Sequence, residues 1–203
     1  MDIILNLIIT IVLILIILTF HELAHGWMAW QFGDPTAKYE GRLTLNPISH
    51  LDPIGALCLT VTVCLGWPAM GWAKPVPVVR ERLANPAVHL PIVALAGPVS
   101  NFIMAFIGAI LFQFLGRMPL MNIICIRFIQ INLALGLFNL IPIPPLDGFR
   151  ILMGLLPQNM ANNIEYKVSS NPAFQYVGII IAILIANAII MAPYRYLFGL
   201  LVG

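Results

Sequence analysis

Apolar residues are gathered into five long runs along the chain, the last of which extends to Val202. The runs lie at about 3–30, 54–73, 88–115, 119–141 and 173–192, separated by short segments that hold most of the charged residues and prolines. A helix needs about 20 predominantly apolar residues to cross the hydrocarbon core of a bilayer. The pattern therefore predicts an all-α multi-pass membrane protein, a compact bundle of about five transmembrane helices.

Composition agrees with a membrane location. Of the 203 residues, 61% are hydrophobic and 9% are charged, whereas soluble domains average about 45–50% and about 25%. The net charge of +2 is scattered, without the basic patch typical of nucleic-acid binding, so we expect no nucleic-acid partner. Asp2 and the lack of a small-residue cleavage site argue against a signal peptide. We expect one integral-membrane domain over 1–203, without a soluble accessory domain.

Lysine and arginine residues indicate the orientation of the runs, because they collect near the cytoplasmic ends of membrane helices. Most of them follow the first, second and fourth runs: Lys38, Arg42, Lys74, Arg80, Arg82, Arg150 and Lys167. On the opposite side we expect Arg117 and little else. If those three connections are cytoplasmic, 54–73 enters and leaves on one face, as a re-entrant segment broken near Gly66 and Pro68. An ordinary spanning helix stays open as the alternative, because about 20 residues also fit a crossing.

Residues 36–46 show a short period-two pattern, in which Arg42, Thr44 and Asn46 alternate with Leu43 and Leu45. Alternation of this kind is typical of a strand with one exposed face. We therefore expect a short β element at the membrane edge.

The strongest chemical pattern is His21-Glu22-Leu23-Ala24-His25, near the end of the first apolar run. Helix positions four apart share a face, so His21 and His25 can both direct an imidazole nitrogen at one metal ion. Glu22 lies to the side, where its carboxylate can reach a water without joining the ligands, as a hydrolytic zinc site requires. Ionisable residues inside a membrane are costly to bury, which favours a functional site over a chance match.

A catalytic zinc ion normally needs a further protein ligand beside two histidines. Most acids of the chain lie in or beside polar connections, where solvated charges are expected: Asp2, Asp34, Glu40, Asp52, Glu81 and Glu165. Asp147 differs because it follows a long apolar run and the prolines within 142–145, which prevent a helix from continuing. An unpaired carboxylate there would be costly, so Asp147 is the leading candidate. Glu40 and Asp52 compete with it, since both are closer in sequence to His25.

Together these motifs resemble the site-2 protease family of intramembrane metalloproteases. The resemblance rests on H-E-L-A-H at 21–25 and L-D-G at 146–148, which occur in the family's order and each at a helix end. Asn139, the A-G-P-V-S-N segment at 96–101 and the G-W-A-K-P-V-P segment at 71–77 support it. The chain is similar to the minimal branch of the family, which lacks PDZ and CBS domains.

The resemblance implies a zinc endopeptidase with a catalytic core over about residues 15–155. The implied ligands of one zinc ion per chain are His21, His25 and Asp147. Glu22 would be the catalytic base, Asn139 would hold the substrate or stabilise the oxyanion, and Asn101 is a further candidate for that role. The expected substrate is a transmembrane or membrane-edge segment of another protein, cleaved in regulated intramembrane proteolysis. The expected location is a prokaryotic cell membrane, with the active site toward the cytoplasm.

Several residues keep two interpretations. Asn101 and Asn139 could instead join helices through hydrogen bonds. His50 and Asp52 could line the entrance of the site or help to bind the metal, or they could be a solvated loop histidine and a helix-capping aspartate. Arg127, within an apolar run, should pair with a polar group or reach toward the interface. The alternative function is a non-catalytic membrane metal transporter or helix-binding scaffold, although neither needs a glutamate beside the ligand pair; no oligomeric state is predicted.

Overall fold

The computed structural model describes residues 3–65 and 71–203, most of which are helical. Four of the described helices are long and apolar enough to cross a membrane. They are α1 (Ile3–Gln31), α4 (Pro86–Leu115), α5 (Pro119–Asn139) and α8 (Ala173–Val202). The prediction of an all-α multi-pass membrane protein is confirmed, with four candidate spans in the described residues where the sequence predicted about five.

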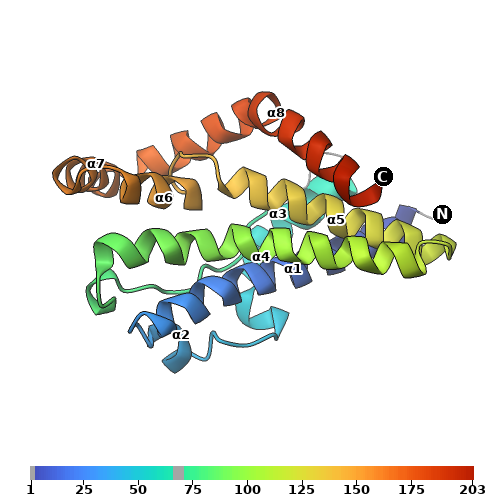
Figure 1. Cartoon of the computed structure of the whole chain (residues 1–203), viewed down its shortest axis with the longest axis horizontal. Helices are drawn as coiled ribbons and strands as arrows, with labels where there is room; N and C mark the ends of the chain where they lie inside the picture. Colours follow the sequence, from blue (N-terminus) through green and yellow to red (C-terminus); the bar gives the residue numbers. More distant parts are fainter. Residues whose placement is uncertain (1–2, 66–70) are drawn as a thin grey trace.

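α4 lies at the centre of the bundle and packs against both α1 and α5, while α8 arches over α5 (Figure 1). A Cβ atom at Gly108 of α4 would lie 2.8 Å from Phe128 Cδ1, so the absence of a side chain at this position makes room for the Phe128 ring of α5. The adjoining buried core consists of Ala105, Ala109, Ile129 and Leu133, packed against side chains of α8. Small residues are common between membrane helices because association there depends on close packing.

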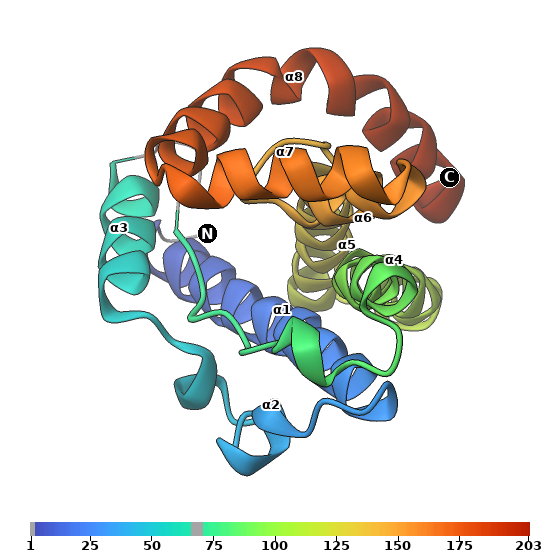
Figure 2. The same ribbon diagram turned by 90° about the vertical axis from the view of Figure 1, so that its left-hand side faces the viewer.

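The connections between the long helices contain shorter ones. These are α2 (Thr36–Tyr39), η1 (Pro47–His50), α3 (Pro53–Cys64), η2 (Arg80–Arg82), α6 (Asp147–Leu155) and α7 (Gln158–Ser170). Figure 2 shows α7 and α8 on the opposite side of the bundle from α1 and α2. Phe32 after α1 stacks on His89 in α4, with ring centroids 4.1 Å apart, and Arg80 pairs with Glu165 on α7. The connections after α1, before α4 and after α5 therefore meet at one end of the bundle.

In the described residues of the second apolar run, the one helix is too short to span a membrane. α3 has 12 residues, well below the about 20 that a crossing needs. Leu51, before α3, forms an isolated antiparallel bridge with Ala73, so the two ends of the intervening segment meet. This geometry agrees with the re-entrant prediction. The break predicted near Gly66 and Pro68 lies outside the described residues.

The predicted strand at 36–46 is wrong, because this region contains the helical turn α2 followed by an irregular connection. Asp34 Oδ1 accepts a hydrogen bond from the backbone N–H of Thr36 at 3.0 Å and so starts the turn. Gly41, with a φ of 65°, then reverses the chain. In the part of the chain that the structure describes, β pairing is confined to the isolated bridge named above. The alternation was too short to distinguish a strand from a loop.

α6 begins at Asp147, and its first turn is pressed against the end of α5. A Cβ atom at Gly148 would lie 2.3 Å from Leu140 O and 2.5 Å from Ile141 O, which leaves room for glycine alone. The prolines within 142–145 lie in the turn between the two helices. This contact fixes the position from which Asp147 faces α1.

Candidate metal centre

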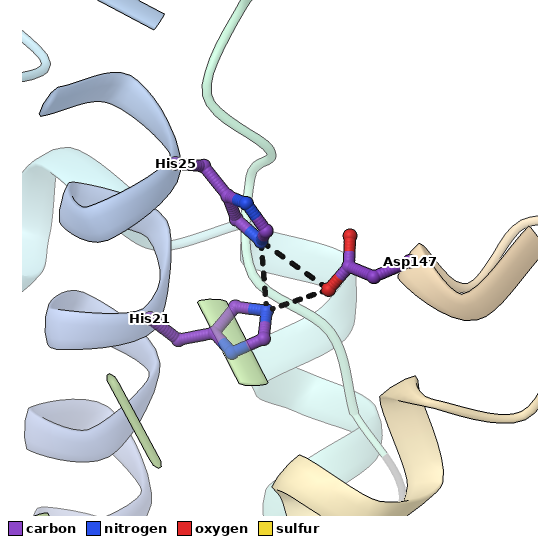
Figure 3. A group of neighbouring side chains, drawn as sticks. All are labelled: His21, His25 and Asp147. Atoms are coloured by element: carbon purple, nitrogen blue, oxygen red, sulfur yellow. Dashed lines mark hydrogen bonds and ion pairs between the residues drawn. The ribbon is translucent and has the colours of Figure 1, made fainter. Parts of the chain in front are cut away.

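His21 and His25 project from one face of α1, and Asp147 faces them from the start of α6 (Figure 3). The Nε2 atoms of the two histidines are 3.1 Å apart, and each lies 3.3 Å from Asp147 Oδ2. Both histidines are buried, and the aspartate side chain is 13% exposed. The structure thus brings together the three residues that the sequence motifs indicated as zinc ligands.

Each histidine is held through its other ring nitrogen by α4. His25 Nδ1 lies 2.7 Å from the backbone carbonyl oxygen of Val93, and His21 Nδ1 lies 2.6 Å from Asn101 Oδ1. Because these oxygens can only accept, each Nδ1 donates a hydrogen, and the lone pair of the neutral imidazole is on Nε2. Contacts of this kind orient most metal-binding histidines.

Three acceptor atoms, the two Nε2 atoms and Asp147 Oδ2, therefore converge without a donor hydrogen between them. Asp147 Oδ2 is buried without a hydrogen-bond partner among the described residues. Ligand atoms about 2.0–2.1 Å from a tetrahedral zinc ion lie about 3.3–3.4 Å apart, close to the separations found here. The donor set and its spacing fit zinc.

α4 comes very close to the two imidazoles at Gly97. A Cβ atom at this position would lie 2.3 Å from His25 Nε2 and 2.6 Å from His21 Cε1. A side chain of any size would therefore overlap the candidate ligands. This contact gives a physical reason for the glycine of the A-G-P-V-S-N segment at 96–101.

Glu22 lies beside the histidines on α1 and is half-buried. Its Oε2 accepts a hydrogen bond from the backbone N–H of Val76 at 2.8 Å. Val76 belongs to the extended segment 71–79, whose far end is fixed by a 2.6 Å hydrogen bond from Val79 N to Asp34 Oδ2. The G-W-A-K-P-V-P sequence thus holds one carboxylate oxygen of the predicted catalytic base.

The two predicted asparagines have different surroundings. Asn101 is 1% exposed, with Oδ1 bonded to His21 and Nδ2 donating to Asn132 Oδ1 at 3.2 Å. Its amide is therefore engaged in hydrogen bonds between helices, which favours support of His21 over direct contact with a substrate. Asn139 ends α5 and donates to Leu135 O at 3.0 Å. No hydrogen bond joins Asn139 to the three candidate ligands within the described ranges.

The other acids and His50 lie apart from this cluster. Asp52 Oδ1 accepts from Gly55 N at 2.8 Å and so caps α3. His50 is buried, and its Nε2 donates to Thr44 O at 2.9 Å. Glu40 is exposed. None of the three joins the described group of possible metal ligands.

Arg127 finds polar partners on α1. Its Nη1 donates to Thr10 Oγ1 at 2.6 Å and to Asn6 O at 3.2 Å, while Nη2 donates to Asn6 Oδ1 at 2.8 Å. Pairing with polar groups is the first of the two interpretations considered for this residue. It explains how an arginine is accommodated in an apolar helix.

Some contributors to the site were not predicted. The carbonyl of Val93 and the amide of Val76 are backbone groups, and no residue type indicates them. Arg42 was assigned to a strand, but its guanidinium donates to Lys74 O and so anchors segment 71–79. Asn132 carried a usable signal, because it is a polar residue within an apolar run.

Comparisons with known proteins give one family. The model described as Peptidase family M50 matches residues 119–185, which include Asp147. "Putative zinc metalloprotease YwhC" of Bacillus subtilis is 44% identical over 156 residues, covering 72% of this chain and 68% of that protein. "Putative zinc metalloprotease Rip2" of Mycolicibacterium smegmatis is 31% identical, covering 83% of this chain and 62% of that protein. The chain thus spans roughly two thirds of the length of these relatives. No solved structure matches.

Proposed function

This chain belongs to Peptidase family M50, the site-2 protease family, and from that membership we propose that it is a zinc endopeptidase that cleaves peptide bonds within the bilayer. Its zinc ion is held by His21, His25 and Asp147. The observation that carries the proposal is the cluster of three converging acceptor atoms, two of them on a helix apolar enough to span a membrane. Ionisable groups in such a position are candidates for function.

Zinc on these ligands would supply Lewis acidity, which acidifies water and polarises a carbonyl group. Glu22 takes a proton from the attacking water on Oε1, because Oε2 is held by the Val76 amide. The water oxygen bonds to the carbonyl carbon, and Glu22 returns the proton to the leaving nitrogen as the C–N bond breaks. Asn139 Nδ2 donates to the substrate or the oxyanion after giving up its bond to Leu135 O.

The depth of the site supports cleavage within the membrane. α1 ends at Gln31, six residues beyond His25 and ten beyond His21. At about 1.5 Å per residue, the ligands lie roughly 9–15 Å from the end of a helix that is long enough to span. Both histidines therefore lie inside the candidate membrane span of α1 and not at its end, which supports cleavage at membrane depth.

The substrate is a transmembrane or membrane-edge helix that unwinds before cleavage. Carbonyl groups in a helix are engaged by amides four residues later, which hides them from a nucleophile. Helix-breaking residues near the scissile bond should therefore speed cleavage. Replacing such residues with leucine in an identified substrate should slow its cleavage, and an unchanged rate would contradict this step.

The active site opens toward the cytoplasm of a prokaryotic cell. Arg80 pairs with Glu165, and Arg82 Nη1 donates to Thr36 Oγ1, so three of the basic connections are in contact at one end of the bundle. Arg117 lies in the connection between α4 and α5, at the other end of α4. Positive charge collects on the cytoplasmic side of membrane proteins, which supports this orientation.

The experiment that tests the function compares the wild-type protein with Glu22→Gln. Wild-type protein purified in detergent should contain one zinc ion, and membranes from cells that express it should contain new protein N-termini within membrane segments. The Glu22→Gln protein should keep the zinc ion and produce none of these N-termini, because the base is lost and the ligands are not. A metal transporter or a scaffold would give the same N-termini in both, and that result would exclude the protease.

A further inference from the structure

A chain of hydrogen bonds runs from the backbone of α5, through α4, to the zinc-ligand candidate His21. Asn132 Nδ2 donates to Phe128 O, one turn earlier on α5, at 2.8 Å. Asn101 Nδ2 donates to Asn132 Oδ1 at 3.2 Å, and Asn101 Oδ1 lies 2.6 Å from His21 Nδ1. Asn101 and Asn132 are 1% and 0% exposed, so water cannot replace these partners.

The donor and acceptor of every hydrogen bond in this series follow from the group at its end, the Phe128 carbonyl. The Phe128 carbonyl can only accept, so the Asn132 amide must turn its NH2 group toward it and its oxygen toward Asn101. Asn101 must then present NH2 to Asn132 and its oxygen to His21. His21 Nδ1 is thereby required to donate, and the lone pair is placed on Nε2.

The two candidate histidines therefore obtain the same tautomer in different ways. His25 Nδ1 donates directly to a backbone carbonyl, that of Val93 on α4. His21 reaches a backbone carbonyl through two intervening amides. We infer that Asn132 is a positioning residue for the metal site, which sets the tautomer of His21 through Asn101 without touching zinc or substrate.

Packing around Asn101 and Asn132, the relay that connects His21 to the Phe128 carbonyl, supports this role. Gly136 lies one turn after Asn132 on α5, and a Cβ atom there would be 3.2 Å from Asn101 Cβ and from Phe102 Cζ. A larger residue at this position would press on the side chains of Asn101 and Phe102. The glycine thus permits the approach that brings the two amides within hydrogen-bond distance.

The inference rests on the zinc site proposed above, and zinc affinity tests both separately. We would purify wild type, Asn132→Leu, Asn101→Leu and the double variant in detergent, and measure the zinc Kd by competition with a chelator. Loss of an orienting partner weakens metal binding by about 10–100-fold. Because the two amides act in series, the double variant should bind zinc about as weakly as either single variant. Independent residues would instead give a loss of affinity equal to the product of the two single losses.

A second readout distinguishes positioning from packing. In zinc-free wild-type protein, the ¹⁵N NMR signals of His21 should report hydrogen on Nδ1, whereas Asn132→Leu should populate the Nε2–H tautomer as well. Leu133→Ala is the matched control, since Leu133 is the next residue on α5 and 1% exposed. It should lower the Tm of the zinc-free protein and leave the zinc Kd unchanged. Asn132→Ala gives the same test if Asn132→Leu does not fold.

A wild-type Kd and a single tautomer in the Asn132 variants would overturn the relay, as would equal weakening by Leu133→Ala. Failure of the zinc site itself has a different result. If His21→Ala retains zinc with wild-type affinity, the proposed ligand set is wrong whatever the Asn132 variants do.

Discussion

Gly97→Ala is expected to abolish zinc binding while leaving the bundle folded. The new Cβ atom would lie 2.3 Å from His25 Nε2, and contacts between such atoms do not fall below about 3.0 Å, so a movement of about 0.7 Å is needed. Zinc sites tolerate deviations of only about 0.2 Å in ligand distances. Since the loss of an orienting contact already costs about 10–100-fold in affinity, displacement of a ligand should weaken zinc binding by at least about 100-fold.

Gly108→Ala is the matched control, because it is the same substitution on the same helix. Its Cβ atom would lie 2.8 Å from Phe128 Cδ1 and 3.0 Å from Ile129 Cγ1, which belong to side chains away from the zinc ligands. Overpacking costs about 1–3 kcal/mol, and each kcal/mol lowers Tm by about 2–4 °C in a protein of this size. Both zinc-free variants should therefore show a modestly lower Tm.

The assay is metal analysis of the two purified variants, followed by a chelator titration and by thermal unfolding in detergent. Gly97→Ala should lose zinc and Gly108→Ala should retain it with wild-type affinity. Retention of wild-type affinity by Gly97→Ala would refute the argument from the close approach of α4.

Four further changes test other parts of the site. Asp147→Ala should lose zinc and turnover together, whereas Glu40→Ala should keep both; metal analysis and cleavage assays check this, and full zinc in Asp147→Ala would require another ligand. Glu22→Gln should retain zinc but lose about 10²–10⁴-fold in turnover, and near-normal cleavage would exclude it as the base. Val76→Pro removes an amide bonded to a carboxylate, a contact worth about 1.5–3 kcal/mol, so turnover should fall about 10–100-fold with zinc retained, while Val76→Ala should behave as wild type. A cysteine at Glu81, in a background without native cysteines, should react with impermeant reagents from the cytoplasmic side, and labelling only from outside would reverse the proposed orientation.

Local periodicity was enough to predict the part of the site that lies on one helix. His21 and His25 are four residues apart, and helix geometry alone requires such residues to share a face. Asp147 is more than a hundred positions away, so no periodicity relates it to them. The family resemblance and the cost of an unpaired carboxylate indicated it, and the contact of Gly148 with the end of α5 shows how it is placed.

Other features could not be predicted because they depend on backbone groups or on distant packing. The Val93 carbonyl is a group that every residue type has, and the Val76 N–H is one that every residue type except proline has. The alternation at 36–46 failed as evidence for a strand because Asp34 starts a helical turn and Gly41 reverses the chain. Whether 54–73 crosses the membrane was open from length alone, and the bridge that joins its two ends favours re-entry.

The division of the proposed metal ligands between α1 and α6 also affects the order of events during biosynthesis. His25 leaves the ribosome 122 residues before Asp147, which corresponds to about 6–24 s at about 5–20 residues per second. During that interval α1 carries two histidines and a glutamate whose partners on α4, α6 and segment 71–79 follow later in the chain. The ligand set is complete only after α5 has been made, so a nascent chain at the translocon has no assembled protease to act on its neighbours.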